Sequence, residues 1–166
     1  LQAKGDFVNY KMSDNKALFH SDHKNMGTAA ALASASLSDA RVLMRRQMDG
    51  KTALNINPKY LIVSPENETI AKQLLTSESD LSGNNSGVTN IHKNSLDLIV
   101  ESELSANPWF LAAARKTIKT GTLAGTGGQP IVQEKMKSAG GVEFECLYDF
   151  GVMIEDHRSL YRNLGA

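Results

Sequence analysis

The stretch VEFECLYDFGVMI, residues Val142–Ile154, carries an apolar or aromatic side chain at every second position. Such a period of two is the repeat of a β-strand, whose successive side chains point to opposite faces. Because ordinary strands have about 5 or 6 residues, we expect either one unusually long, unbroken strand or a bend near Gly151, where the chain would leave one sheet for another region. The buried face of this stretch would hold Val142, Phe144, Cys146, Tyr148, Phe150, Val152 and Ile154.

The same stretch contains two sequences that resemble parts of active sites. Asp149-Phe150-Gly151 spells the magnesium-binding triplet of protein kinases, but the chain lacks the other kinase motifs and the length of a kinase. Asp156-His157 suggests two members of a Ser-His-Asp triad. Neighbouring residues of an extended chain point to opposite faces, however, and no G-x-S-x-G motif is present. Strand patterning is the simpler interpretation of the triplet, and we interpret His157 and Arg158 as surface or interface residues.

Histidines near the N-terminus form a candidate metal site. His20, Asp22 and His23 lie within four residues, and a further ligand would have to come from His92 or His157 at no recognisable spacing. Solvated histidines in a polar loop are the interpretation that we favour. The sequence therefore predicts no metal site, no cofactor and no catalytic residue.

Two other segments suggest binding of phosphate or nucleic acid. The glycine-rich segment 121–130 lacks the Gly-Lys-Ser/Thr of a phosphate-binding loop and leads into a predicted strand, so we interpret it as a connection between strands. Arg41, Arg45 and Arg46 form a basic helix face without accompanying aromatic residues. We expect that face to contact solvent or another subunit.

Composition limits the classes of function. Of the 166 residues, 18 are basic and 18 acidic, and this zero formal net charge argues against a strong, sequence-independent hold on nucleic acid or a membrane surface. The single cysteine, Cys146, excludes an internal disulfide framework. The length predicts one domain. Because the chain begins at Leu1 without a methionine, we expect it to be the C-terminal part of a longer chain.

Helix signals occur in two places. Ser36 and Asp39 resemble a capping box, which predicts a helix over 37–48 with Gly50 as its stop. Its apolar face would hold Leu37, Ala40, Met44 and Met48. Ser64 and Pro65 predict the start of a second helix. The buried face of this second helix would hold Ile70, Leu74 and Leu75.

Short apolar runs predict further strands on either side of a polar surface loop at 76–90. These strands are expected over 60–63, 96–104, 109–114 and 131–136.

Several stretches, taken in order, resemble the major head subunit of Mu-like prophages, a branch of the tailed-phage major capsid proteins. The stretches are DNKALFHSDHKN (14–25), SLSDARVLMRRQMDGKTALNINPKYLIVSPENETIAKQLL (36–75), WFLAAA (109–114) and GGVEFECLYDFGVMIEDHRSLYRNLGA (140–166). The resemblance implies an α+β chain with the tailed-phage major capsid fold of the Hong-Kong-97 type. Residues 1–166 would form a single capsid-protein domain, with an axial lobe at about 57–136 and peripheral-lobe elements, including the long strand, at about 28–50 and 137–166.

The resemblance implies a non-enzymatic structural subunit that assembles into pentamers and hexamers enclosing a genome. Its partners would be copies of itself, a scaffold, a prohead protease and packaged DNA held without sequence-specific contacts, and no membrane. Assembly in the bacterial host cytoplasm and a final location in the virion capsid follow. Glu143, Glu145 and Glu155 are expected to face a neighbour's Lys or Arg, or solvent. Two alternatives remain: a segment of a fusion between a prohead protease and a coat protein, and a monomeric capsid-binding module.

Overall fold

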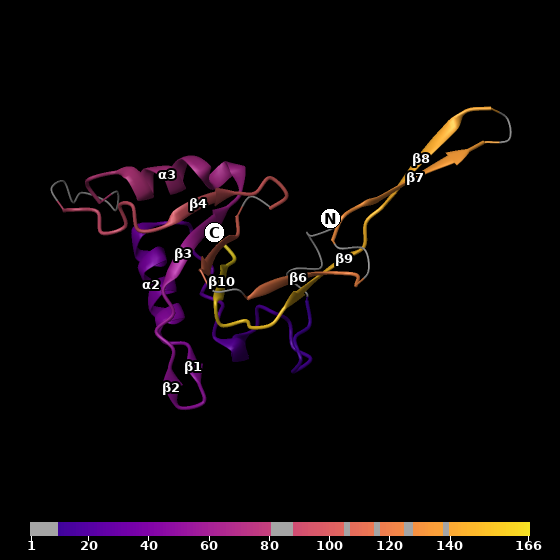
Figure 1. The fold of residues 1–166 in the computed structure, drawn as a ribbon. Coiled ribbons are helices and arrows are strands. Elements are labelled where there is room, and N and C mark those ends of the chain that lie inside the picture. Colours follow the sequence, from indigo (N-terminus) through magenta and orange to yellow (C-terminus); the bar gives the residue numbers. More distant parts are fainter. Residues whose placement is uncertain (1–9, 81–87, 105–106, 115–116, 125–127, 138–139) are drawn as a thin grey trace. The chain divides into compact units, whose positions relative to one another are not determined.

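The computed structural model describes residues 10–80, 88–104, 107–114, 117–124, 128–137 and 140–166. The chain divides into two compact units (Figure 1). The first unit combines Leu1–Arg115 with Asp156–Ala166, and the second, Lys116–Glu155, is inserted between them in sequence. The predicted axial and peripheral lobes concern places in an assembled shell and stay a prediction.

A four-stranded mixed sheet is the centre of the first unit, with the strand order β10-β5-β3-β4. β3 (Pro58–Val63) pairs in parallel with β4 (Asp97–Val100), whereas β5 (Trp109–Ala113) pairs antiparallel with both β3 and β10 (Leu160–Asn163). The expected strands at 60–63 and 109–114 are confirmed, and the one at 96–104 is shorter than expected. A parallel pair needs a crossover. Here that crossover includes η2 (Pro65–Asn67) and α3 (Glu68–Thr76).

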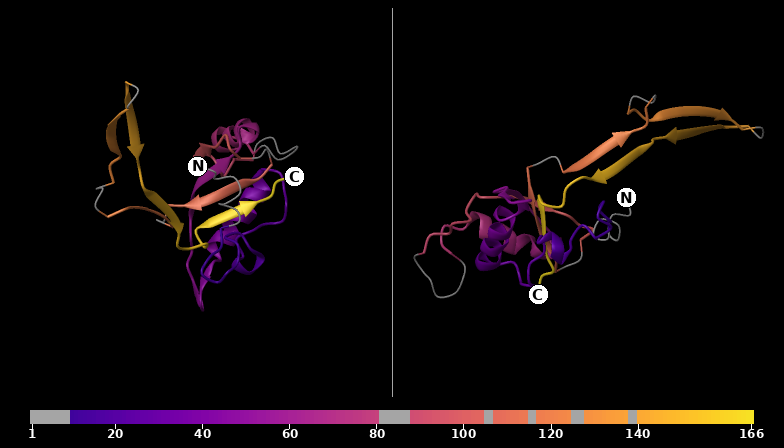
Figure 2. Two further views of the ribbon diagram at one scale, coloured as in Figure 1. Left: turned by 90° about the vertical axis from the view of Figure 1, so that its right-hand side faces the viewer. Right: turned by 90° about the horizontal axis from the view of Figure 1, so that it is seen from below.

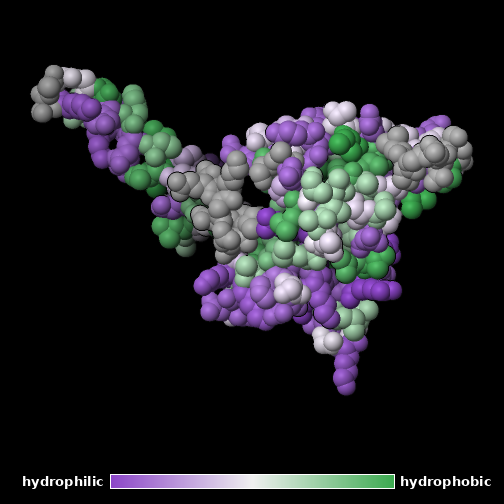
Figure 3. Space-filling view, turned by 180° about the vertical axis from the view of Figure 1, so that it is seen from behind, coloured by the Kyte–Doolittle hydropathy of each residue, from purple (hydrophilic) through white to green (hydrophobic). Residues whose placement is uncertain are grey.

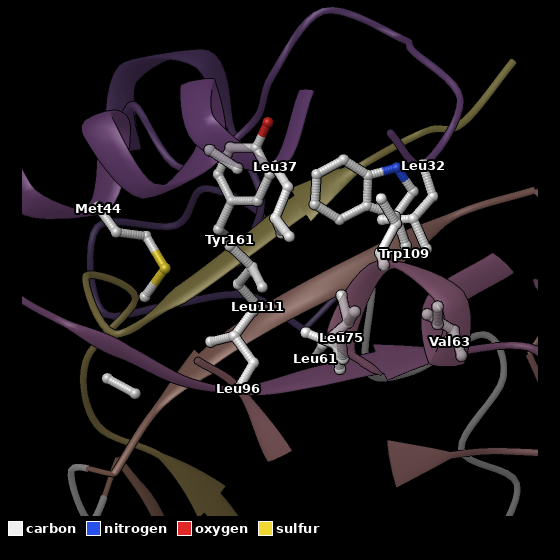
Figure 4. Packing of buried hydrophobic residues seen from close by; sticks show 14 of the residues in the cluster. Leu32, Leu37, Met44, Leu61, Val63, Leu75, Leu96, Trp109, Leu111 and Tyr161 are labelled. Carbon is white, nitrogen blue, oxygen red and sulfur yellow. The ribbon is translucent and has the colours of Figure 1, made fainter. Parts of the chain in front are cut away.

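The hydrophobic core lies on one face of this sheet (Figure 4). Leu61, Leu111 and Tyr161 stand in register across β3, β5 and β10, so their side chains share a face, and all are buried. Both helices contribute to the same cluster. Trp109 is fully buried and its indole N–H donates to the carbonyl of Ala30 at 3.1 Å. A buried aromatic side chain thus also satisfies its one polar group.

The first helix, α2 (Ser34–Arg45), begins and ends about three residues earlier than expected. Ser36 is the third helical residue and not the cap: its hydroxyl accepts from the Ala33 amide at 3.0 Å. Leu37, Ala40 and Met44 are buried as predicted. Met48 is exposed, because the chain continues as a small hairpin of β1 (Met48–Asp49) and β2 (Thr52–Ala53). Gly50 therefore forms the turn of this hairpin at φ +59 and is not a helix stop.

The second helix begins as expected but buries a slightly different face. Ser64 caps η2 with Pro65 as its first residue, and α3 follows. Leu74 and Leu75 are buried as predicted, but the third buried position is Ala71. Ile70, expected inside, is 45% exposed. The actual helix face is rotated by one residue from the predicted one.

The opposite face of the sheet is covered by the segment 10–26, which contains η1 (Ser21–His23). Phe19 contacts Phe110 of β5 with ring centroids 5.6 Å apart, and both rings are buried. Backbone bonds join Asn25 and Gly27 to Arg162 of β10. The segment is therefore attached to the sheet through side chains and main chain.

The second unit consists of two-stranded antiparallel pairs (Figures 1 and 2). β6 (Ile118–Thr122) pairs with β9 (Phe150–Ile154), and β7 (Ile131–Met136) pairs with β8 (Val142–Leu147). β7 was expected and β6 was not. The predicted unbroken strand over 142–154 is wrong, because Tyr148 and Asp149 separate β8 from β9. Gly151 does not bend the strand, since it pairs with Gly121 inside the β6–β9 ladder.

Among the described residues, no helix has the length and apolar content needed to cross a membrane.

Candidate assembly surface

The register of β7 and β8 sorts their side chains onto two chemically different faces. Residues directly opposite one another in an antiparallel pair share a face. Val132 lies opposite Cys146, Glu134 opposite Phe144, and Met136 opposite Val142. We call this side the apolar face; its residues in β7 and β8 are Val132, Glu134, Met136, Val142, Phe144 and Cys146.

The other side of the same hairpin, the charged face, pairs its own charges. Lys135 contacts Glu145, and Lys137 contacts Glu143 with 3.4 Å between the ammonium nitrogen and a carboxylate oxygen. Gln133 lies opposite Glu145 on this face. Such exposed pairs contribute about 0–1 kcal/mol each. The same side also holds Ile131 opposite Leu147, and both are exposed.

The apolar series continues into β9. Val152 lies opposite Thr120, and Phe150 opposite Thr122. Between the two strands, Tyr148 packs on Phe150 with ring centroids 5.4 Å apart. Tyr148, Phe150 and Val152 are each about half exposed. Figure 3 shows hydrophobic residues exposed along this unit beside hydrophilic ones.

The sequence pattern predicts that the apolar series is buried, yet in the single chain it is open to solvent. Phe144 is 70% exposed and Met136 is 86% exposed, whereas Ile154, at the end of the series, is buried. A two-stranded ribbon is at best marginally stable alone in water, since it has no second layer to cover its apolar side. Contiguous exposed apolar residues of this kind mark interaction surfaces. The apolar face is the candidate assembly surface.

Comparison with known proteins places the chain in a family of shell-forming proteins. The model of the phage capsid protein family matches residues 1–163. The chain belongs to the phage capsid protein family. This is a family of structural proteins, and membership agrees with the coarser part of the resemblance seen in the sequence.

One solved structure, an encapsulin, supports a capsid-type fold for this chain. The holo-SrpI encapsulin complex of Synechococcus elongatus matches with a TM-score of 0.55 and 10% identity, covering 98% of this chain and 57% of that chain. The virus-like particle of Pyrococcus furiosus matches with a TM-score of 0.43 and 14% identity, over 84% of this chain and 54% of that one. The chain thus spans little more than half the length of these proteins. No curated protein sequence matches it.

The structure places the residues of both motifs that suggested catalysis. Asp149 lies in the break between β8 and β9, while Phe150 and Gly151 belong to β9. Asp156 accepts a hydrogen bond from the Arg158 amide at 3.0 Å. His157 lies flat against His23, with ring centroids 3.9 Å apart. Sequence reasoning missed this last pairing, because 134 positions separate the two residues.

In the described part of the chain, no group of three or more His, Cys, Asp or Glu side chains is arranged so that it could hold a metal ion. The interpretation as a solvated histidine is wrong for His23, which is buried and has its Nε2 2.8 Å from a carboxylate oxygen of Asp14. His92 is buried elsewhere, with its Nε2 3.1 Å from the carbonyl oxygen of Ser34. Burial lowers the pKa of His92, which favours the neutral ring.

The basic helix face is partly used within the chain. Arg45 donates to the side-chain oxygens of Asn55 and Asn57 at 3.2 and 3.0 Å. Arg41 lies 3.4 Å from Nδ1 of His92, and burial lowers the pKa of this guanidinium. Arg46 is exposed, as expected. The glycine-rich segment 121–130 begins in β6 and leads into β7, a connection between strands as predicted; its residues 125–127 lie outside the described part.

The expectation for Glu143, Glu145 and Glu155 needs a correction. They are at least partly exposed, but each already pairs with a lysine of the same chain, Glu155 with Lys119 at 2.6 Å. The lysines of KMK (135–137) and the glutamates of VEFE (142–145) alternate at matching positions. That pattern, considered as a hairpin, would have revealed two of these pairs.

Proposed function

We propose that this chain belongs to a structural, non-enzymatic subunit of a phage or prophage head shell, and that its copies contact one another through the apolar face of β7, β8 and β9. Family membership supports a structural role in a capsid. The exposed apolar face carries the proposal, because it presents a large apolar side chain such as Phe144 to solvent in the single chain.

The finer expectations are part of the same proposal. The subunit would be of the Mu-like prophage type with a Hong-Kong-97-type fold, and its pentamers and hexamers would enclose the genome. Scaffold, prohead protease and packaged DNA are its proposed partners, the virion capsid its final location, and the host cytoplasm its place of assembly. The balance of 18 basic and 18 acidic residues favours assembly into a closed shell, because highly charged copies would repel each other there.

A matched pair of lysine substitutions tests the proposal. Phe144→Lys places a charge on the apolar face opposite Glu134, and Gln133→Lys places the same charge on the charged face opposite Glu145. Both variants gain one positive charge facing a glutamate, so they differ mainly in the face that they alter. We expect Phe144→Lys to weaken self-association at least tenfold, because burying an ammonium group is costly. Gln133→Lys should associate like the wild type.

The measurement is electron microscopy together with sedimentation of the full protein that contains this chain, expressed alone. Rings or shells formed by the wild type and Gln133→Lys but not by Phe144→Lys would support the proposal. Equal assembly of all three proteins would exclude the apolar face as the contact. Wild-type monomers that bind only to preformed shells would instead indicate a capsid-binding module. Proteolytic activity of the full protein would indicate the protease fusion.

A further inference from the structure

The ring of His23 is held between two hydrogen-bond acceptors. Its Nδ1 lies 3.0 Å from the carbonyl oxygen of Leu18, and its Nε2 lies 2.8 Å from a carboxylate oxygen of Asp14. A carbonyl and a carboxylate only accept. The two contacts hold the ring between the Leu18 carbonyl and the Asp14 carboxylate. The ring is 5% exposed.

The second ring of the pair comes from the other end of the chain. His157 stacks on His23 at 3.9 Å with 15° between the ring planes. It precedes β10, whereas His23 belongs to the segment 10–26 that lies on the outer face of the sheet. The stack is therefore one of the contacts that attach this segment to the C-terminal strand, beside the backbone bonds from Asn25 and Gly27 to Arg162.

On balance, the surroundings of His157 oppose protonation of its neutral ring. Burial is the largest cause that lowers its pKa below the ordinary 6.5, and the neighbouring His23 and Arg158 lower this pKa further. Asp156 and Asp14 act in the opposite direction. Arg158 also pairs with Asp49 of β1 at 3.1 Å. Three further titratable groups lie nearby: His20, whose ring centroid lies 6.0 Å from that of His23, its neighbour Asp22, and Lys16, which pairs with Asp22 at 2.5 Å.

We propose that the stack of His23 on His157 is a proton-sensitive latch, which holds the segment 10–26 on the sheet at neutral pH and releases it in weak acid. At neutral pH His157 stacks on His23 as a neutral ring, because burial lowers its pKa. Uptake of a proton by His157 would place a cationic ring against His23 in a partly buried site. Release of the segment exposes His157 to solvent. The solvated ring binds that proton more easily.

The direction of the effect follows from linkage. The pKa of His157 is lower in the closed state than in the open one, so the open state binds more protons once the pH falls below about 6.5. Opening therefore becomes more favourable by at most tenfold per pH unit, until His157 in the closed state also takes up its proton. The pKa of Asp14 is lowered from 3.8, chiefly by its hydrogen bond to His23. The stabilising contribution of the Asp14 carboxylate is lost only at a pH below the range from 7 to 5.

Amide hydrogen exchange tests the latch. Protection factors for Gly27 and Arg162, whose amides bond between the segment and β10, should fall several-fold between pH 7 and 5. The amide of Leu111 in the core strand β5 reports on global opening and should change less. His157→Phe keeps a stacked aromatic ring but cannot titrate, so its protection should not depend on pH in this range. His20→Gln, which alters an exposed neighbour, should behave like the wild type.

Equal pH dependence in the wild type and His157→Phe would overturn the proposal, as would wild-type protection that does not change from pH 7 to 5. If His157→Phe fails to fold, proton NMR titration of the wild-type ring decides. A pKa of His157 below that of an unfolded histidine supports the latch, and an equal or higher one overturns it. None of these results depends on assembly, so the test is independent of the proposed function.

Discussion

Single residues in the first unit connect the segment before α2 with the C-terminal strand β10. Asn163 is buried: its side-chain oxygen accepts from the amides of Ala30 and Gly165, and its amide group donates to the carbonyl of Thr28 at 2.9 Å. One side chain thus joins the segment before α2 to the C-terminal strand. This explains in physical terms why the closing LYRN sequence (160–163) is informative about the fold.

The close approach of Gly27 to Tyr161 gives a prediction at the same scale. A Cβ at position 27 would lie 1.8 Å from the hydroxyl oxygen of Tyr161, a ring that is buried in the core. Gly27→Ala should therefore lower the free energy of unfolding by about 1–3 kcal/mol, the usual cost of overpacking. Combining it with Tyr161→Phe removes the nearest clashing atom, so the double variant should lose less than the sum of the two single losses.

Chemical denaturation of the four proteins measures this coupling. Gly121→Ala is the control, because a Cβ there meets nothing within 4 Å, and its unfolding free energy should stay within about 0.5 kcal/mol of the wild type. Strictly additive losses in the double variant would show that the hydroxyl group of Tyr161 is not the obstacle.

At the scale of elements, Gly121 and Gly151 stand opposite each other in the ladder of β6 and β9, with open space beside both. Glycine weakens a strand, and threonine has high β-propensity. Gly151→Thr should therefore stabilise this strand pair by about 0.5–1 kcal/mol, which raises amide protection in β9 roughly two- to fivefold. Gly50→Thr is the contrasting variant and should destabilise the β1–β2 turn, because Gly50 has φ +59. Lower amide protection in β9 of the Gly151→Thr variant would instead support the bend that we first expected at Gly151.

Sequence patterns predicted the presence of strands and helices better than the residues at which they begin and end. The period-two series at 142–154 indicated strand correctly on both sides of Tyr148, but the break is invisible because the alternation of side chains continues through it. β6 was missed because IKTGT has little apolar alternation, and its pairing depends on β9. In α2, the hydroxyl of Ser36 acts from the third helical position, which the residue type alone does not distinguish from a cap.

The candidate site was predictable in content but not in exposure. Its apolar residues in β8 and β9 were identified from their spacing and expected to be buried, whereas Val132 and Met136 of β7 were not identified. Burial depends on a second layer, and local sequence does not say whether that layer comes from the same chain or from another. The stack of His23 and His157 was not predictable either, because tertiary structure alone brings positions 23 and 157 together.

At the scale of the whole molecule, the main hydrophobic cluster among the described residues belongs to the first unit, since each of its members lies outside Lys116–Glu155. The second unit is inserted between β5 and β10, which pair antiparallel with Ala112 opposite Leu160. The amide of Ala113 also bonds to the carbonyl of Ser159. The chain therefore leaves and re-enters the first unit at neighbouring points, so a short turn in place of the insertion would leave a simple β-hairpin.

Replacing residues 116–155 with a short Gly-Ser linker should accordingly leave the first unit folded. We expect one cooperative thermal transition within roughly 5 °C of the wild type, because the buried contacts of the main cluster are unchanged. Self-association should be lost, since the deleted segment carries the apolar face. Circular dichroism and sedimentation measure the two properties separately. A deletion variant that folds and still assembles would move the assembly surface to the first unit, whereas one that fails to fold would mean that the core depends on the ribbon after all.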